Sequence, residues 1–90
     1  MTKKQTDFKM QNLIRLKVRK EVDARQQHTI LKLKGGLISK GFTEIIHIID
    51  LDEEFHVNTF KMPTDKVNEA RQFIDAFIKQ ENLSDIVTFN

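Results

Sequence analysis

Residues 42–60, FTEIIHIIDLDEEFHVNTF, contain two apolar runs on either side of an acidic segment, and this stretch decides most of the fold. The second run, FHVNTF, alternates, with Phe55, Val57 and Thr59 against His56, Asn58 and Phe60, and a period of two is typical of a β-strand. The first run, residues 42–49, is rich in isoleucine, which packs well on a pleated sheet. Two such runs joined by a short polar loop predict an antiparallel hairpin, although the first run also fits one face of a helix.

The clearest helical pattern begins after Pro63, which ends the predicted hairpin because proline cannot donate to a sheet ladder. Apolar side chains then recur at helical spacing, at Val67, Ala70, Phe73, Ile74, Phe77 and Ile78. This stripe predicts an amphipathic helix over residues 66–81, with Thr64 as its N-cap and Asp65 in its first turn. The stripe is expected to cover the isoleucine-rich sheet, and residues 85–89 predict a short edge strand.

Residues 6–27 fit two patterns, of which the helical one is favoured. Apolar residues from Met10 to Val22 follow one helical stripe, no Gly or Pro interrupts the segment, and opposite charges recur four residues apart. Against this, residues 14–19 alternate between apolar and basic side chains, as a strand would. The sequence therefore predicts a helix over residues 6–27, with a short strand followed by a helical turn at residues 20–27 as the alternative.

Residues 28–40 predict two further strands around a pair of glycines. Residues 28–34 alternate as a strand does, and residues 37–40 return as a second strand. Gly35 and Gly36 both accept a positive φ, which is typical of a tight turn. Together these elements predict an α+β fold, with an N-terminal helix, an antiparallel sheet of four to five strands and a C-terminal amphipathic helix packed on the sheet.

The length and composition predict one small α+β domain over residues 1–90, with residues 1–5 expected to be disordered. The chain has no cysteine, which excludes disulfides and cysteine-ligated zinc. No apolar run approaches the length of about 18 residues that a transmembrane helix requires. The polar start of the sequence predicts no secretory signal, so a cytoplasmic protein without a membrane partner is expected.

The net charge of +2 conceals a strong separation of charge along the chain. Residues 1–40 contain eleven Lys or Arg and three acids, a net charge of +8, whereas residues 41–90 contain four Lys or Arg and ten acids, a net charge of −6. Such asymmetry favours a basic surface that binds a polyanion, unless the two halves neutralise each other within the fold. The side chains predicted to contact nucleic acid are Arg15, Lys17, Arg19, Lys20, Lys32 and Lys34. Lys32 and Lys34 are expected to point the same way from their strand.

No motif supports catalysis, so a non-enzymatic protein without a cofactor or metal is predicted. Residues 36–43 have the glycine spacing of a phosphate-binding loop, but Phe42 stands where that loop needs lysine. If residues 51–52 formed the hairpin loop, His47 would lie opposite His56, but two histidines are too few ligands for zinc. The acidic hairpin loop lacks the glycine and the final glutamate of a calcium-binding loop.

The leading hypothesis is a small bacterial or phage protein that binds nucleic acid through its basic N-terminal half. The alternative is a protein–protein interaction module, such as a regulator, inhibitor or adaptor, that acts through a sheet edge or an apolar patch. Charge of both signs also suits self-association, so a homodimer is a further expectation.

Overall fold

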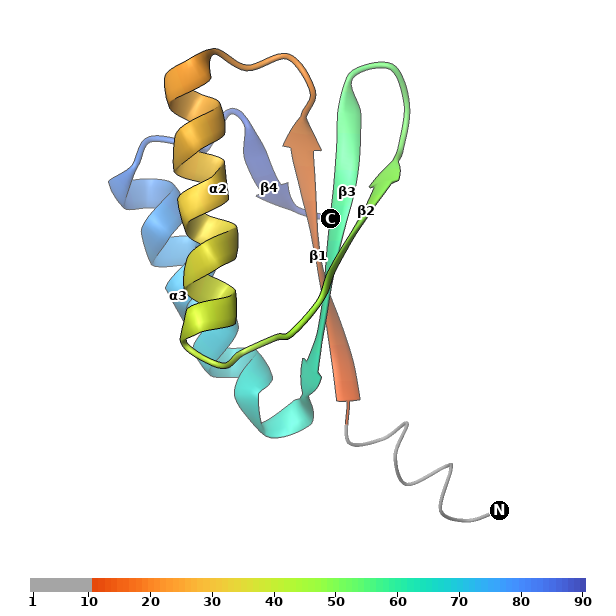
Figure 1. Cartoon of the computed structure of the whole chain (residues 1–90), viewed down its shortest axis with the longest axis vertical. Helices are drawn as coiled ribbons and strands as arrows, with labels where there is room; N and C mark the ends of the chain where they lie inside the picture. Colours follow the sequence, from red (N-terminus) through yellow and green to blue (C-terminus); the bar gives the residue numbers. More distant parts are fainter. Residues whose placement is uncertain (1–10) are drawn as a thin grey trace.

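The computed structural model describes residues 11–90, with side chains from Leu13 onward (Figure 1). In chain order the elements are β1 (Gln11–Arg19), α2 (Ala24–Ser39), β2 (Ile46–Asp50), β3 (Phe55–Pro63), the 3₁₀ turn η1 (Thr64–Lys66), α3 (Val67–Gln80) and β4 (Val87–Phe89). The predicted α+β class is confirmed, including an antiparallel sheet of four strands and a C-terminal amphipathic helix packed on it.

The sheet has the strand order β2-β3-β1-β4, and every neighbouring pair is antiparallel. The strands β1 and β3 therefore lie in the centre, while β2 and β4 form the two edges. Two β-α-β units interleave, because β3 lies between β1 and β2, and β1 lies between β3 and β4. This connectivity is the split β-α-β arrangement, a topology that hosts many functions and identifies none.

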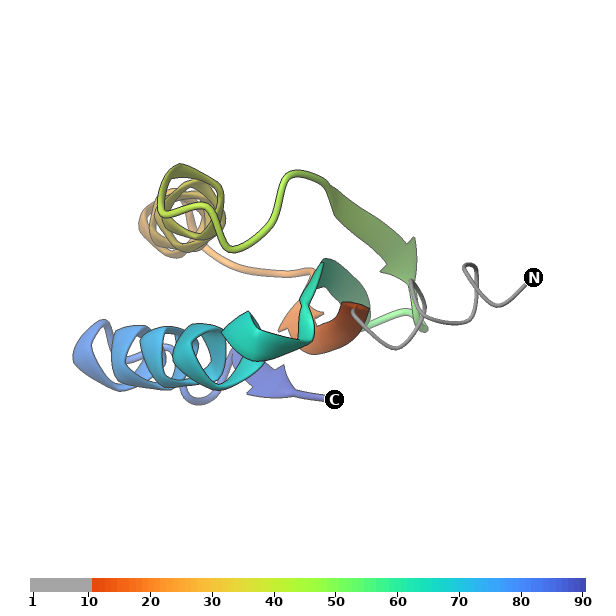
Figure 2. The same ribbon diagram turned by 90° about the horizontal axis from the view of Figure 1, so that it is seen from below.

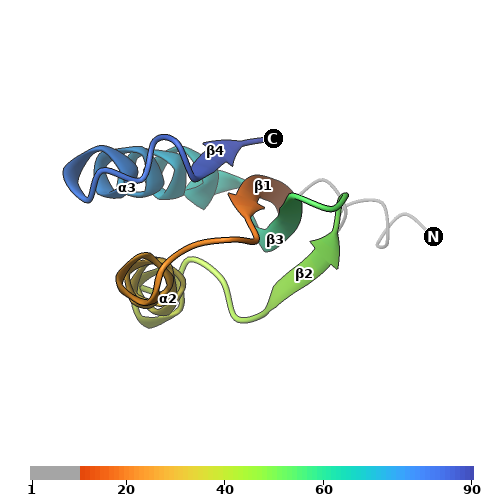
Figure 3. The same ribbon diagram turned by 90° about the horizontal axis from the view of Figure 1, so that it is seen from above.

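Both helices lie on one side of the twisted sheet, next to each other (Figures 2 and 3). We call this side of the sheet the covered face and the opposite side the open face. The core forms between the helices and the covered face, and its most deeply buried side chains include Ile14, Leu16, Leu33, Leu37, Phe60, Met62, Ala70 and Ile74. The strands β1, β3 and β4 and both helices each contribute buried apolar side chains to the core, whereas β2 and η1 contribute none that is fully buried.

The first helix begins later than predicted, because residues 11–19 form the strand β1. Burial alternates strictly along residues 13–19, so the two-residue period, and not the helical stripe, describes this segment. The strand pairs with β3 along its whole length and with β4 over Leu16–Val18, and these long-range hydrogen bonds outweigh the local helical preference. The alternative of a strand followed by helix is closer to the structure. Residues 1–5, predicted to be disordered, lie outside the described residues.

Residues 24–39 form the single helix α2, so the two strands predicted over residues 28–40 are wrong. The helix begins with a capping box. The Asp23 carboxylate accepts the Gln26 backbone N–H at 2.7 Å, and the Gln26 side-chain oxygen accepts the Asp23 backbone N–H at 3.0 Å. Three apolar residues then recur at helical spacing and are buried, namely Ile30, Leu33 and Leu37.

The predicted glycine turn is also wrong, because Gly35 and Gly36 both lie within α2. A Cβ atom at Gly36 would lie 3.0 Å from Cζ of Phe73 on α3, closer than nine in ten real Cβ contacts. Glycine at this position therefore lets the two helices approach, and a packing requirement explains the residue better than a turn does.

The hairpin predicted over residues 42–60 is confirmed as β2 and β3, but its loop is longer than two residues. Asp52 shapes the loop, because its Oδ1 accepts the backbone N–H groups of Glu54 and Phe55 at 2.8 and 2.9 Å. The longer loop shifts the strand register away from the one that would bring the two histidines together.

In the observed register His47 pairs with Thr59, and His56 pairs with Asp50. Because side chains on one strand alternate between faces, His47 lies on the open face and His56 on the covered face. The predicted apposition of the two histidines is therefore wrong.

The C-terminal helix predicted over residues 66–81 is confirmed as α3, and the predicted edge strand is confirmed as β4. The predicted helix start is slightly wrong, because Thr64 begins the 3₁₀ turn η1 and Lys66 occupies the N-cap position of α3.

Candidate nucleic-acid interface

A row of basic side chains follows β1 on the open face. The buried side chains of β1 point to the covered face, so the alternating residues Arg15, Lys17 and Arg19 point to the open face. Successive members of this row are about 6.8 Å apart, because a strand rises about 3.4 Å per residue. The row therefore offers three evenly spaced cations along the centre of the sheet.

The neighbouring strands complete the open face without adding an acid. By the strand register, the residues beside the row are Phe55, Val57, Thr59 and Lys61 of β3, His47 and Ile49 of β2, and Thr88 of β4. Lys61 supplies a fourth cation. Asp50, the acidic residue of β2, lies on the covered face with its pairing partner His56. No described strand therefore directs an Asp or Glu side chain to the open face.

The cations of the open face have no carboxylate partner among the described residues. The ion pairs found among the described residues join Lys20 to Asp50, His56 to Asp50, and Lys79 to Asp75. Arg15, Lys17, Arg19 and Lys61 take part in none of them, so the acidic half of the chain does not neutralise this row by direct contact.

Phe55 holds two members of the row in place at one end of the sheet. The Lys17 Nζ atom lies 4.5 Å and the Arg19 Cζ atom 5.3 Å from the centroid of the Phe55 ring, both within cation–π range. The Arg19 Nε–H also donates to the backbone carbonyl of Asp85 at 3.4 Å. Neither contact removes the positive charge, so both groups remain able to attract an anion.

Lys20 is separated from the row although it follows Arg19 directly. Its Nζ atom lies 3.4 Å from Oδ1 of Asp50, and the same oxygen lies 3.3 Å from Nδ1 of His56. The His56 contact has ion-pair distance but lacks hydrogen-bond geometry, so this ring nitrogen is buried without a hydrogen-bond partner. Lys20 is thus engaged by an acid of its own chain.

The structure places Lys32 and Lys34 on α2, away from the open face. Two residues along a helix differ in direction by about 200°, so the prediction that both side chains point the same way is wrong. Lys32 is exposed, whereas Lys34 is half-buried next to Ile30 and Leu37, and desolvation lowers the pKa of its ammonium group. Neither lysine extends the row on β1.

Three of the six predicted residues thus come together, and the sequence-based prediction missed Lys61 and Phe55. Phe55 and Lys61 are six positions apart in one strand, so the two-residue period places them on the same face of β3, although polar and apolar side chains stop alternating at Thr59. The sequence held no signal for the pairing of β3 with β1, which joins residues 36 to 52 positions apart.

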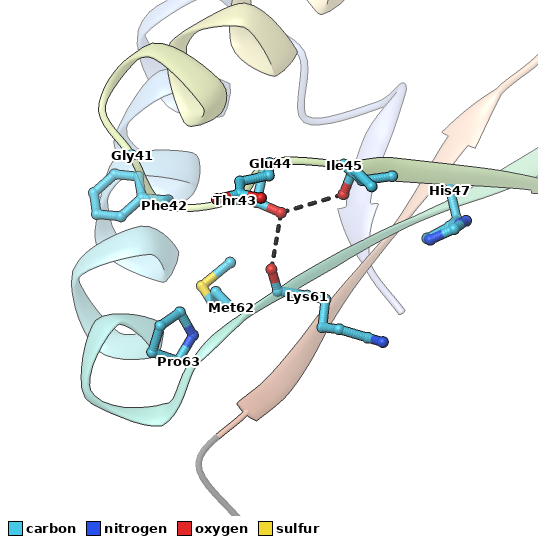
Figure 4. A pocket seen from close by; sticks show the side chains of 9 residues that line it. All are labelled: Gly41, Phe42, Thr43, Glu44, Ile45, His47, Lys61, Met62 and Pro63. Atoms are coloured by element: carbon cyan, nitrogen blue, oxygen red, sulfur yellow. Dashed lines mark hydrogen bonds between the residues drawn. The ribbon is translucent and has the colours of Figure 1, made fainter. Parts of the chain in front are cut away.

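A hollow of about 350 Å³ lies between the end of α2 and the hairpin, lined by residues that include Phe42, Thr43, His47 and Lys61 (Figure 4). Its buried polar side chain, Thr43, lies with its hydroxyl 2.8 Å from the Lys61 carbonyl oxygen and 3.2 Å from the Ile45 carbonyl oxygen. The hydroxyl proton is therefore used within the chain, and the hollow shows no buried polar group directed at a ligand.

Residues 11–90 contain no cluster of three His, Cys, Asp or Glu side chains arranged to hold a metal ion. Nor is either helix of that range long and apolar enough to span a membrane. The chain matches no protein-family model, no curated protein and no solved structure, so the site must be interpreted from its own chemistry.

Proposed function

We propose that the protein binds nucleic acid on the open face of its sheet, through contacts between phosphate groups and Arg15, Lys17, Arg19 and Lys61. The observation that carries the proposal is the one-sided charge of that face. Four cations point to it from the two central strands, and no described strand adds an acid. Each phosphate neutralised in this way releases counterions, which supplies affinity that does not depend on sequence.

The width of the sheet favours a single strand over a duplex. Four strands spaced about 4.8 Å apart span about 14 Å before their side chains are added, whereas the major groove of B-DNA is about 12 Å wide. The open face therefore does not fit inside a groove. A flexible single strand can instead lie across the sheet and bring successive phosphates to successive cations.

The side chains between the cations favour contacts to the backbone over stacking with bases. Sheets that read bases carry exposed aromatic rings on their central strands. Here the corresponding positions hold Val57 and Thr59, and the aromatic ring of Phe55 is half-buried and already in contact with two cations. We therefore expect binding with little sequence preference and a strong dependence on salt.

Fluorescence anisotropy with a labelled single-stranded oligonucleotide tests the proposal. Binding is expected at low salt, and the slope of log K against log salt should approach about −3 if four phosphates are engaged, at about −0.7 for each phosphate of a single strand. A duplex of the same length should bind more weakly. No binding at low salt, or binding that salt does not affect, would reject the proposal.

A matched pair of double variants separates the open face from overall charge. Arg15→Gln with Lys17→Gln removes one arginine and one lysine from the row, and Arg25→Gln with Lys32→Gln removes the same charges from the exposed surface of α2. The first variant should lose affinity and reduce the slope by about 1.4, at about 0.7 for each lost phosphate contact. The second should lose far less. Equal losses would mean that the open face has no special role.

The second candidate function is a protein-interaction module that acts through the edge strand β2. The observation that favours it is a group of exposed aliphatic side chains on and beside that strand, Ile45, Ile48, Ile49 and Leu51. Exposed apolar side chains that lie together often mark an interaction site. A pull-down from nuclease-treated lysate distinguishes the two functions, because only a protein partner survives the treatment.

A further inference from the structure

The edge strand β2 is apolar and exposed on both of its faces. Ile49 points to the open face and Ile48 to the covered face, and their exposed fractions are 59% and 53%. The residues that flank the strand on either side, Ile45 and Leu51, are 61% and 49% exposed. Ile48 thus lies on the covered face but outside the core cluster that the helices bury.

The hydrogen-bond pattern shows which backbone groups of β2 point away from the sheet. The Leu51 N–H donates to the Phe55 carbonyl at 3.0 Å, which makes this pair a hydrogen-bonded one. Hydrogen-bonded and non-hydrogen-bonded pairs alternate in an antiparallel ladder. Ile46, Ile48 and Asp50 therefore direct their N–H and C=O groups to the outer side of the sheet, where the described residues place no strand.

Of the devices that usually protect an edge strand, β2 carries a charged side chain, Asp50 on the covered face, but that carboxylate is already paired with Lys20 and His56. Natural sheets shorten their edges or place lysine, proline or a bulge there. The opposite edge follows this rule, because β4 has only three residues. β2 has five residues, IHIID, without lysine or proline, and it pairs with β3 in an unbroken register. The outward N–H and C=O groups of β2 can therefore pair with another strand.

We propose that this strand is a second copy of β2, joined in antiparallel fashion about a two-fold axis to form a continuous eight-stranded sheet. With the axis at Ile48, Ile48 of one copy lies opposite Ile48 of the other, and Ile45 lies opposite Leu51. The outward-pointing residues 46, 48 and 50 of each copy then meet their counterparts in hydrogen-bonded pairs. The same patch serves both copies, as a two-fold interface requires.

The size of the patch sets the expected strength of the dimer. A standard interface buries about 800 Å² per partner, and one five-residue strand with four half-exposed aliphatic side chains offers less. The dimer is therefore expected to be weak and to form as protein concentration rises. The inference rests on the second candidate function and not on nucleic-acid binding, so it is tested without nucleic acid.

Sedimentation velocity over a range from low micromolar to millimolar protein tests the proposal. The average mass should rise from the 10.6 kDa of one chain towards twice that value as concentration increases. A protein that stays monomeric throughout the range would overturn it, even if β2 captured some other protein from a lysate.

Two variants and one control locate the interface. Ile48→Lys places like charges at the two-fold axis and should weaken the dimer about tenfold or more, whereas Leu31→Lys replaces an equally exposed side chain on α2, 56% exposed, and should leave it intact. Ile48→Pro removes an outward N–H without removing a bond to β3, and should also abolish pairing. Circular dichroism confirms that each variant is folded. A dimer that survives both Ile48 substitutions would place the interface elsewhere and overturn the proposal.

Discussion

The two faces of β1 differ in role, because one packs in the core and the other presents cations to solvent. On the covered face Ile14, Leu16 and Val18 are almost completely buried against the helices. On the open face, one residue further along in each case, Arg15, Lys17 and Arg19 are exposed or half-exposed and have no acidic partner among the described residues. Neighbouring residues in one strand can thus differ completely in what they contribute to stability and to binding.

Burial, and not position in the chain, therefore determines what a substitution in β1 costs. Removing a buried aliphatic group loses its transfer free energy and leaves a cavity, whereas removing an exposed cation changes mainly the electrostatic field. Substitutions at Leu16, at Lys17 with Phe55, and at Lys34 test this division.

The largest effect is expected at Leu16, which is 1% exposed. Leu16→Ala should lower the free energy of unfolding by about 2–5 kcal/mol, because the surrounding core cannot fill the cavity. Its neighbour provides the control, since Arg15→Thr keeps a residue that suits a strand and should change stability by no more than about 0.5 kcal/mol. Urea denaturation measures both. Similar losses at the two positions would show that the open face is as tightly packed as the covered face.

A smaller effect is expected where the open face does contribute to stability. Lys17 and the Phe55 ring form a cation–π contact at 4.5 Å, and exposed contacts of this kind contribute about 0.5–1 kcal/mol. A double-mutant cycle with Lys17→Met and Phe55→Leu should show a coupling energy of that size, measured by urea denaturation. Additive effects of the two substitutions would mean that the ring does not hold Lys17.

The smallest change in stability is expected at Lys34, a half-buried cation on the helix α2. Desolvation lowers the pKa of Lys34 below its ordinary value of 10.5, so the folded chain loses this proton before the unfolded chain does. Stability should therefore rise between the lowered pKa and pH 10.5. Lys34→Met, which removes the charge, should stabilise slightly at neutral pH, and its advantage should shrink as pH approaches 10.5.

Thermal unfolding of both proteins over this pH range measures the difference. Lys32→Met removes an ammonium group from the exposed side of the same helix and should gain no comparable stability. An advantage of Lys34→Met that does not vary with pH would attribute the effect to packing of the methionine instead of to the charge.

The hairpin, α3 and β4 could be predicted from the sequence because their patterns are local. In β3 the side chains alternate over consecutive residues, and in α3 the apolar stripe repeats within a few turns. Such patterns report directly on which face of an element is buried. In β3, however, the pattern indicated the strand but not its orientation, because the polar His56 and Asn58 lie on the covered face while Phe55 and Val57 lie on the open face.

The first half of the chain was harder to predict because its local signals conflict. In β1 the charges four residues apart favour a helix, and only pairing with β3 and β4 makes the strand preferable. In α2 the glycine pair resembles a turn, whereas Gly36 suits the close approach of the Phe73 ring. The signal that could have revealed this helix is Asp23 followed by Gln26, the capping box at its start.

The candidate site could be predicted only in part, for a related reason. The alternation of residues 14–19 places Arg15, Lys17 and Arg19 together once the strand is recognised. Lys61 joins them only through the pairing of β1 with β3, and Lys20 leaves them only because Asp50 lies within reach. Both outcomes depend on contacts between distant parts of the chain, which one sequence does not reveal.

Because β4 is short, the first part of β1 is hydrogen-bonded to a described strand on one side only, namely to β3. The Arg19 N–H donates to Ile86, and Arg15 accepts from the Asn90 N–H, so odd-numbered residues of β1 face β4 and even-numbered ones face β3. Leu13 lies beyond the bond between Asn90 and Arg15, so among the described residues no strand accepts its amide proton. The Leu13 amide proton should therefore exchange with water quickly. The Ile14 amide proton faces β3 and should exchange slowly. Local opening of the sheet is therefore expected to start at this end of its central strand.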